Sequence, residues 1–285
     1  MGTKGETALV TGASSGIGRE TAIKMVENGY HVIAAARRMD RLTELADQVG
    51  DVTPKKVDLS DPEDVDRFCQ DISGLPEPVS VLVNNAGYSI RGTLEDVSME
   101  AVKRIFEVNL FSMVRVTQAC LPGMRRLRKG TIVNLSTILG KFTFPMGGFY
   151  AATKHALEAV SNALRMEVRP FGIRVVAIRP GVIGTEFNEV ANELSGDPMA
   201  RTDPDYKPVY QAFGAAMGKL FADVSIPGPE LVANLILEAV LSDAPKTAYA
   251  VGLFSDDIFA ERERLDDDAF DLYWTEKTGL TGLKV

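Results

Sequence analysis

The sequence is poor in the residues that build disulfide frameworks and metal centres. Its 285 residues include two cysteines, Cys69 and Cys120, and two histidines, His31 and His155. Two cysteines in apolar, periodic segments cannot form a disulfide framework, and they predict a reducing, cytoplasmic compartment. Neither histidine has a cysteine, a histidine or a pair of carboxylates at ligand spacing, so the sequence predicts no catalytic metal.

The chain also lacks an excess of basic residues and any long apolar run. Thirty-nine Asp and Glu residues against 31 Lys and Arg residues give a formal net charge of −8, whereas a general nucleic-acid-binding protein carries a basic face. No apolar stretch reaches the roughly 18 residues that a membrane span requires. These absences argue against nucleic acid as a partner and against a membrane span, and they favour a small-molecule ligand.

Short apolar runs instead alternate with segments of helical periodicity. Nearly continuous runs of Val, Ile, Leu and Ala are typical of parallel strands that are buried on both faces. The alternation predicts an α/β fold, with a doubly wound, mostly parallel, seven-stranded sheet of Rossmann type and helices on both faces. We expect strands at 7–10, 31–36, 54–57, 80–83, 131–135, 173–178 and 248–251, and helices at 17–28, 41–49, 62–72, 102–128 and 150–168.

No linker or repeat divides the chain, so we expect one domain over residues 1–285. The segment 186–228 carries scattered aromatic and Met residues and predicts a helical lid over a substrate. The last segment, about 253–285, combines aromatic and acidic residues and forms a C-terminal extension that covers the pocket or reaches a neighbouring subunit.

Three glycines stand close together after the first predicted strand. The segment from Thr11 to Gly18 reads Thr-Gly-Ala-Ser-Ser-Gly-Ile-Gly and leads into the helix at 17–28. Glycine permits a tight turn and a close approach of backbone to a ligand, and a helix N-terminus offers unpaired N–H groups to a pyrophosphate. The turn therefore predicts a dinucleotide site at the carboxyl ends of the strands.

Three more segments follow in a fixed order. They are Asn84-Asn85-Ala86-Gly87, Tyr150-Ala-Ala-Thr-Lys154, and Pro180-Gly181 with Thr185. Together with the glycine turn they resemble, in order and spacing, the motifs of the short-chain dehydrogenases/reductases across roughly the first 240 residues. The segment 247–252 is similar to a late strand of the hydroxysteroid and retinol dehydrogenase branch. The resemblance implies an oxidoreductase.

Tyr150 and Lys154 are four residues apart, so they share one face of a helix. A nearby ammonium group favours the phenolate, and we expect Lys154 together with an oxidised nicotinamide to lower the tyrosine pKa from about 10. The resemblance implies that Tyr150 is the general acid of carbonyl reduction and the general base of alcohol oxidation. It also implies that Lys154 holds the nicotinamide ribose.

Two more catalytic candidates come from the resemblance. The family places a serine hydroxyl thirteen positions before its tyrosine, and Thr137 stands there in this chain, with Ser136 one residue earlier. Neighbouring side chains leave a strand in opposite directions, so one of the two hydroxyls faces the substrate; we favour Thr137 and keep Ser136 as the alternative. Asn109 matches the family's helix-interrupting asparagine, which supports a proton relay near the lysine.

The end of the second strand predicts which cofactor is bound. An acidic residue there would accept hydrogen bonds from the ribose hydroxyls, but this chain has Ala36 followed by Arg37 and Arg38. Two guanidinium groups suit a 2′-phosphate, which predicts NADP(H). An alternative is that both arginines only begin a solvated helix.

The resemblance also implies which other residues contact the cofactor. Asp58 accepts from the adenine amino group, beside Leu59. The further contacts are expected at Gly12, Ser14, Ser15, Gly16, Ile17, Gly18, Asn85, Ala86, Gly87, Pro180, Gly181, Val182, Ile183 and Thr185. Apolar stripes on the helices at 102–128 and 150–168 correspond to the subunit contacts of the family, which implies a homodimer or homotetramer, with burial against the sheet as the competing explanation.

The substrate is predicted to be apolar, because Phe142, Phe144 and Phe149 precede Tyr150 and the lid is rich in aromatic residues. The leading hypothesis is the NADP(H)-dependent interconversion of a hydrophobic secondary alcohol and a ketone, steroid-like or otherwise bulky, by direct hydride transfer. Two alternatives are reduction of a 3-oxoacyl thioester and a non-catalytic NADP(H)-binding sensor of the same fold.

Overall fold

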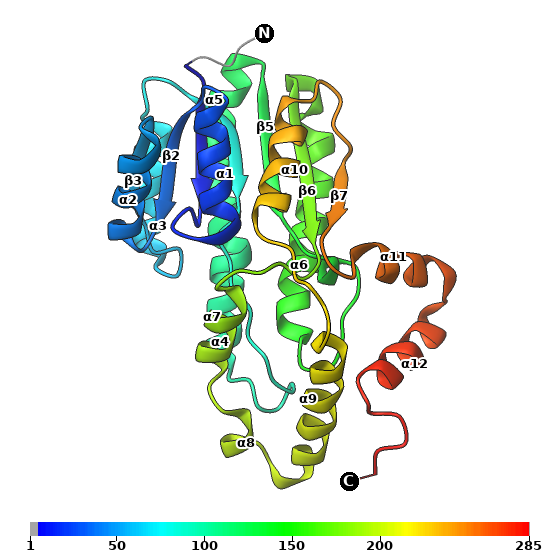
Figure 1. Ribbon diagram of the computed structural model, residues 1–285. Coiled ribbons are helices and arrows are strands. Elements are labelled where there is room, and N and C mark those ends of the chain that lie inside the picture. The colour runs from blue at the N-terminus through cyan, green and yellow to red at the C-terminus, as the bar shows by residue number, and fades with distance from the viewer. Residues whose placement is uncertain (1–4, 285) are drawn as a thin grey trace.

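Seven parallel strands form one sheet in the computed structural model, which describes residues 5–284 (Figure 1). Their order is β3-β2-β1-β4-β5-β6-β7, so the chain winds outward in both directions from the neighbouring strands β1 and β4. The predicted doubly wound, seven-stranded sheet is confirmed, and within it every strand pairing is parallel. The strands are β1 Thr7–Thr11, β2 His31–Ala36, β3 Val52–Lys56, β4 Val79–Asn84, β5 Gly130–Leu135, β6 Ile173–Pro180 and β7 Ala248–Val251.

Helices cover both faces of this sheet because alternate strand residues point to opposite sides. Ala8 and Val10 of β1 pack on one side, and Leu9 packs on the other, all fully buried. The first face is covered by α1 Gly16–Glu27, α2 Met39–Val49 and α10 Glu230–Leu241. The second face is covered by α3 Pro62–Ser73, α5 Ser112–Leu127 and α6 Gly148–Val168. Burial on both faces explains why β1, β2 and β4 are apolar at most positions, whereas the edge strand β3, Val-Thr-Pro-Lys-Lys, has no buried residue.

One expected helix is divided in two. In place of a continuous helix over 102–128, α4 spans Met99–Phe106 and α5 begins at Ser112, with a π-helical turn over Glu107–Phe111 between them. Asn109 lies at the centre of that turn and is buried. π-Helical turns within α-helices are frequent at functional sites. The third strand also begins earlier than expected, at Val52.

The apolar stripe expected to mediate subunit contacts is largely buried within the chain. Val116 and Cys120 of α5 pack against the sheet, and Met113 packs against Leu157 of α6. The competing explanation, burial inside the subunit, therefore accounts for these residues. Phe111 keeps half of its surface exposed at the start of α5.

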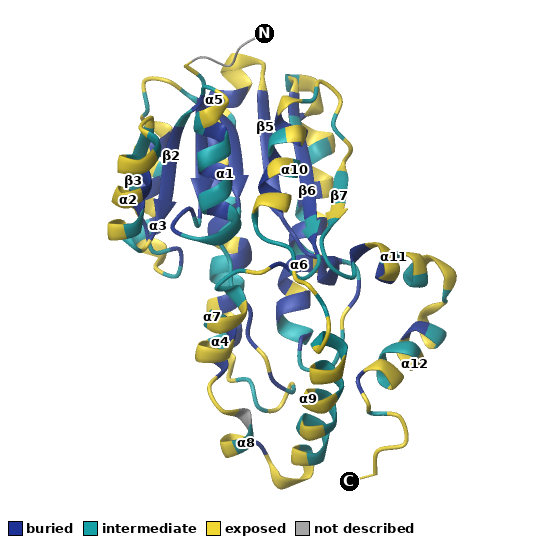
Figure 2. Cartoon of the chain, viewed as in Figure 1, coloured by how far each residue is buried: buried dark blue, intermediate teal, exposed yellow. Residues whose placement is uncertain are grey.

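A second group of helices extends beyond the carboxyl ends of the strands. It consists of α7 Phe187–Ser195, α8 Pro198–Arg201 and α9 Lys207–Phe221, followed near the C-terminus by α11 Ser255–Arg264 and α12 Asp267–Lys277. Figure 2 shows buried strands in the sheet and mostly exposed or intermediate residues in these helices. None of the residues of α9 is buried. Among residues 5–284 no helix is both long enough and apolar enough to cross a membrane.

Candidate active site

A cavity of about 1160 Å³ lies at the carboxyl ends of the strands. It begins at the glycine turn after β1, passes the ends of β4, β5 and β6, and continues between α7, α9 and α12. This is where an open α/β sheet binds ligands, because the loops diverge where the strand order reverses. Of the predicted site residues, all except Gly18 and Asn109 line this cavity.

The glycine turn is shaped by close contacts with the segment after β4. Gly12 has a φ of +68°, and a Cβ added there would lie 2.9 Å from the Ala86 Cα, so any side chain would collide. Gly18 differs from its prediction as a cofactor contact. A Cβ on it would lie 2.4 Å from Asn85 Nδ2 and from the Gly12 carbonyl oxygen. Gly18 therefore lets α1 pack against the loops and does not face the cavity.

Thr11 joins the two cofactor-side loops. Its hydroxyl oxygen accepts hydrogen bonds from the backbone N–H groups of Asn85 and Ala86, both at 3.1 Å, and the Asn85 side chain donates to the Thr11 carbonyl at 2.9 Å. Gly87 follows directly in the same wall. These contacts fix the spacing between the glycine turn and the loop after β4.

The Arg38 side chain, two residues after the end of β2, reaches the glycine turn. Its Nη2 donates to Ser15 Oγ at 2.7 Å and to Ser14 Oγ at 3.2 Å, while its Nη1 pairs with Glu186 at 2.9 Å. Arg41 binds the other oxygen of Glu186 at 2.6 Å. Hydrogen bonds from Arg41, and then from Arg38, hold the pKa of Glu186 below its usual value. Two guanidinium groups thus bind one carboxylate, and one of the two also binds two hydroxyls of the glycine turn.

Sequence reasoning missed Arg41 and Glu186 at this point. Glu186 is 148 positions from Arg38 in the chain, and no local pattern connects the two. Arg37 also lines the cavity, on the side of Asp58.

Asp58 lies in the cavity wall beside Leu59. Burial raises the pKa of Asp58, but hydrogen bonds from the Ser60 N–H at 2.9 Å and the Ser60 hydroxyl at 2.8 Å, and the charges of Arg37 and Arg104, outweigh burial and hold the pKa below its usual value. The carboxylate is therefore ionised and can accept a further hydrogen bond.

Tyr150 and Lys154 share the inner face of α6. The Lys154 ammonium lies 5.9 Å from the centre of the Tyr150 ring and donates to the Leu135 carbonyl at 2.7 Å. Burial lowers the pKa of Lys154 to about 8. Burial also raises the pKa of Tyr150, against which a hydrogen bond with Thr137 acts. Desolvation of the phenol therefore outweighs the proximity of Lys154, and the lowering of the tyrosine pKa by Lys154 together with an oxidised nicotinamide stays a prediction.

Thr137 and Ser136 point in different directions at the end of β5, as strand alternation requires. The Thr137 hydroxyl contacts Tyr150 and also lies 3.1 Å from the Pro180 carbonyl. The Ser136 hydroxyl contacts Glu158, a buried carboxylate that Arg179 binds with two hydrogen bonds. The structure therefore brings Thr137, and not the Ser136 hydroxyl, to the tyrosine.

Asn109 reaches the same region from the π-helical turn. Its side-chain amide donates to the Tyr88 carbonyl at 2.9 Å and to the Thr153 hydroxyl at 3.1 Å, and its oxygen accepts from the Tyr88 N–H at 3.1 Å. A Cβ on Gly87 would lie 3.1 Å from Asn109 Oδ1 and 3.7 Å from Lys154 Nζ. A glycine at this position therefore keeps the space between the asparagine and the lysine open.

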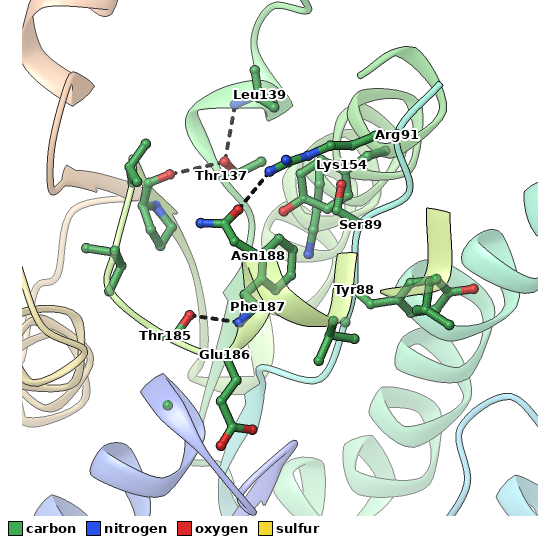
Figure 3. A pocket seen from close by; sticks show the side chains of 18 of the residues that line it. Tyr88, Ser89, Arg91, Thr137, Leu139, Lys154, Thr185, Glu186, Phe187 and Asn188 are labelled. Carbon is green, nitrogen blue, oxygen red and sulfur yellow. Dashed lines mark hydrogen bonds between the residues drawn. The ribbon is translucent and has the colours of Figure 1, made fainter. Parts of the chain in front are cut away.

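The loop after β6 closes the cavity opposite α6. Pro180, Gly181, Val182, Ile183 and Thr185 all line it. The Thr185 hydroxyl accepts a hydrogen bond from the Phe187 N–H at 3.3 Å, at the start of α7 (Figure 3). The Phe187 ring lies 5.8 Å from the Tyr150 ring. The predicted lid segment thus begins next to the tyrosine.

Aromatic side chains form the far end of the cavity. Phe142 stacks on Trp274 of α12 with ring centres 5.4 Å apart, and Phe144 stacks on Phe213 of α9 at 6.0 Å. The C-terminal helices therefore contribute directly to the cavity wall. This agrees with the expectation that the extension covers the pocket.

A doubly wound sheet, a glycine turn where its strand order reverses, and a tyrosine and lysine on one helix face together define the dinucleotide-binding class of α/β proteins. Within that class, the chain belongs to the short-chain dehydrogenase/reductase family of oxidoreductases. The family model described as short chain dehydrogenase matches residues 6–195.

Similar proteins support this assignment over most of the chain. The uncharacterized oxidoreductase YbbO of Escherichia coli K12 is 36% identical over 249 residues, which cover 87% of this chain and 86% of that protein. Human retinol dehydrogenase 8 is 32% identical over 249 residues, which cover 84% of this chain and 79% of that protein.

Solved structures support the same family assignment. A short-chain dehydrogenase from Streptomyces avermitilis has a TM-score of 0.78 and 30% identity, with both chains fully covered. A serine dehydrogenase complexed with NADP+ has a TM-score of 0.72 and 25% identity, with 87% of this chain and 94% of that chain covered.

Proposed function

We propose that this protein is an NADP(H)-dependent oxidoreductase that interconverts a hydrophobic secondary alcohol and the corresponding ketone. The observation that carries the proposal is that Tyr150, Thr137 and Lys154 meet in one cavity with the glycine turn. A general acid, a hydrogen-bond donor and a buried ammonium group are thereby placed at the end of a dinucleotide-shaped cleft.

The proposed roles follow from the atoms that each residue offers. In the direction of reduction, the Tyr150 hydroxyl gives its proton to the carbonyl oxygen, and the Thr137 hydroxyl donates a hydrogen bond to the same oxygen. In the direction of oxidation, the Tyr150 oxygen takes the proton back from the alcohol, and the Thr137 hydroxyl stays hydrogen-bonded to the reacting oxygen. When bound, the nicotinamide cofactor donates or accepts the hydride. Lys154 holds the ribose, and its positive charge favours the phenolate, while Asn109 supports the lysine side of the site.

The choice of NADP(H) rests on the groups at the end of β2. The strand ends on Ala36 and not on an acidic residue, and Arg38 and Arg41 bring two guanidinium groups beside the Ser14 and Ser15 hydroxyls of the glycine turn, where Glu186 binds both. Charge-assisted hydrogen bonds of this kind suit a phosphate. The serine dehydrogenase complexed with NADP+ supports the same choice.

The proposed substrate is bulky and apolar, because the stacked rings of Phe142, Phe144, Phe213 and Trp274 line the far end of the cavity. The relation to retinol dehydrogenase 8 supports a hydrophobic alcohol. We place the site in a single domain of residues 1–285, with 186–228 as its lid, and in a homodimer or homotetramer that light scattering would measure.

Fluorescence titration with NADPH and NADH tests the cofactor, and oxidation of NADPH with steroid, retinoid, aryl ketone and acyl-thioester substrates tests the reaction. Tyr150→Phe should bind NADPH with unchanged affinity and lose at least about 100-fold in turnover, because it lacks the proton. Tyr249→Phe, outside the cavity, is the matched control and should retain turnover. The proposed reaction would be refuted if Tyr150→Phe turned over as fast as the unmodified protein. The cofactor choice would be refuted if NADH bound more tightly than NADPH.

A further inference from the structure

Arg91 brings a positive charge to the lid side of the cavity. It lies between β4 and α4, and its backbone N–H donates to the Ser195 hydroxyl at 2.9 Å. Its guanidinium reaches α7, where Nη2 donates to Asn188 Oδ1 at 2.9 Å and Nη1 donates to Asn192 Oδ1 at 3.1 Å (Figure 3). Asn188 directly follows Phe187, whose ring faces Tyr150. The charge therefore stands near the reacting end of the cavity, on its lid side.

No carboxylate balances this charge within the part of the chain that the structure describes. Arg38 and Arg41 share Glu186, and Arg179 binds Glu158, whereas no carboxylate oxygen of residues 5–284 lies within 4.0 Å of Arg91. Glu193 lines the same cavity but forms no ion pair with it. Both side-chain partners of Arg91 are neutral amides. The residue is partly exposed to solvent where it lines the cavity, so its guanidinium is accessible to a charged ligand.

The contacts of Arg91 leave donors free for a ligand. A guanidinium has five N–H donors in a planar fork, and the two asparagines accept from Nη1 and Nη2 alone. The two amides stand one helical turn apart on α7 and hold the plane of the fork. A planar fork fixed in this way matches a carboxylate, which accepts two parallel hydrogen bonds.

We propose that Arg91 binds a carboxylate of the substrate, so that the substrate is a keto acid or hydroxy acid with a bulky apolar body. The aromatic end of the cavity accommodates the body, and the fork of Arg91 binds the acid group. This inference rests on the proposed function, because the occupant is the molecule that Tyr150 reduces or oxidises. It goes further by giving that molecule a charge and by naming the residue that selects it.

The test compares ketones that differ only in this group. NADPH oxidation is measured with benzoylbutyric acid and its methyl ester, and with oxostearic acid and its methyl ester. We expect kcat/KM to favour each acid by about 10- to 100-fold, mainly through KM, as charge-assisted hydrogen bonds would give. Arg91→Met should remove the preference by weakening the acid and leaving the ester unchanged. Arg91→Lys should keep part of the preference for the acid.

Two further variants separate recognition from support of the lid. Asn188→Ala removes a contact between Arg91 and α7 but keeps the charge, so the preference for the acid should persist. Arg169→Met removes an exposed arginine that does not line the cavity, and both substrates should be unaffected. An equal loss for acid and ester in Arg91→Met would overturn the inference and assign Arg91 a structural role.

A binding measurement makes the test independent of turnover. Calorimetric titration of the NADP+-loaded protein with each acid and its ester should show the same preference, again lost in Arg91→Met. Equal affinities for acid and ester overturn the inference but leave the proposed function intact. Preferential binding of the acid, with no ketone reduced, overturns the proposed function but supports the carboxylate site.

Discussion

The two ends of the cavity are built by different means. At the cofactor end, short turns leave the buried strands β1, β4 and β5, and hydrogen bonds from the backbone N–H groups of Asn85 and Ala86 to the Thr11 hydroxyl set their spacing. At the substrate end, exposed helices are held by side-chain contacts. Glu186 binds Arg38, and Tyr210 of α9 donates to Asp96 at 2.7 Å.

This difference separates stability from specificity. Apolar burial contributes about 25 cal/mol per Å², whereas a single polar contact contributes only about 0.5–1.5 kcal/mol net. The cofactor end is therefore held as firmly as the sheet itself. The lid can open or change its lining residues at small cost to the fold, as expected of elements that admit a substrate.

The largest expected effect contrasts the stability of the two ends. Leu82→Ala empties a fully buried position in β4 and should cost about 2–5 kcal/mol of unfolding free energy. Phe213→Ala on α9 removes a stacking contact at a half-buried position and should cost about 1 kcal/mol, while it changes KM for the ketone. Urea denaturation measures both, and equal losses would show that the lid is part of the cooperative core.

The next contrast lies within the end of β5. Thr137→Ala removes the hydroxyl that contacts Tyr150 and should lower kcat by about 100-fold, as loss of a donor to the reacting oxygen does. Ser136→Ala removes a contact to Glu158 and should lower the melting temperature with little change in kcat. Steady-state kinetics with thermal melting checks both, and Thr137→Ser should restore most of the turnover. A larger kcat loss in Ser136→Ala would reverse the assignment.

The cofactor end should also separate the two nicotinamide cofactors. Arg38→Met removes the donors to Ser14, Ser15 and Glu186 and should raise the Kd for NADPH by about 10- to 100-fold, because the 2′-phosphate loses a charged hydrogen bond. The Kd for NADH should change little. Fluorescence titration measures both constants, and Arg125→Met, on α5 outside the cavity, is the charge-matched control. Equal weakening of both cofactors would mean that Arg38 only supports the turn.

The smallest effect is a pH dependence. Burial lowers the pKa of Lys154 to about 8, so the ammonium loses its proton as the pH rises through that value. If the charged form holds the ribose, kcat/KM at pH 9 should be about tenfold lower than at pH 7. A pH profile of kcat/KM for NADPH from pH 6 to pH 10 measures the descending limb. A flat profile above pH 8 would place the titration elsewhere.

Much of the cofactor end was predictable because its signals are local. The glycine turn, the tyrosine and lysine of α6, and all but two of the predicted site residues line the cavity, where a short segment of sequence dictates them. Asn109 lies behind the lining, and Gly18 does not reach it either, since a glycine required for helix packing has the same local sequence signal as one required by a ligand. The π-helical turn at Asn109 interrupted a helix whose periodicity gave no sign of it.

The substrate end was predictable only in outline. A lid and an apolar wall follow from composition, but the pairing of Glu186 with Arg38 and Arg41, and of Arg91 with two asparagines of α7, joins segments far apart in the chain. The burial of Tyr150 was also not predictable. Proximity to Lys154 can be read from their spacing, but the burial that raises the tyrosine pKa cannot.

The amino-acid sequence by itself determined the order of strands and helices, the glycine turn and the residue types of the catalytic group, because backbone preferences and apolar periodicity act over a few residues. Only the tertiary structure decided which of Thr137 and Ser136 meets the tyrosine, which carboxylate neutralises which arginine, and that the guanidinium of Arg91 meets two amides of α7. Burial and charge balance depend on neighbours that the chain brings together only after it has folded.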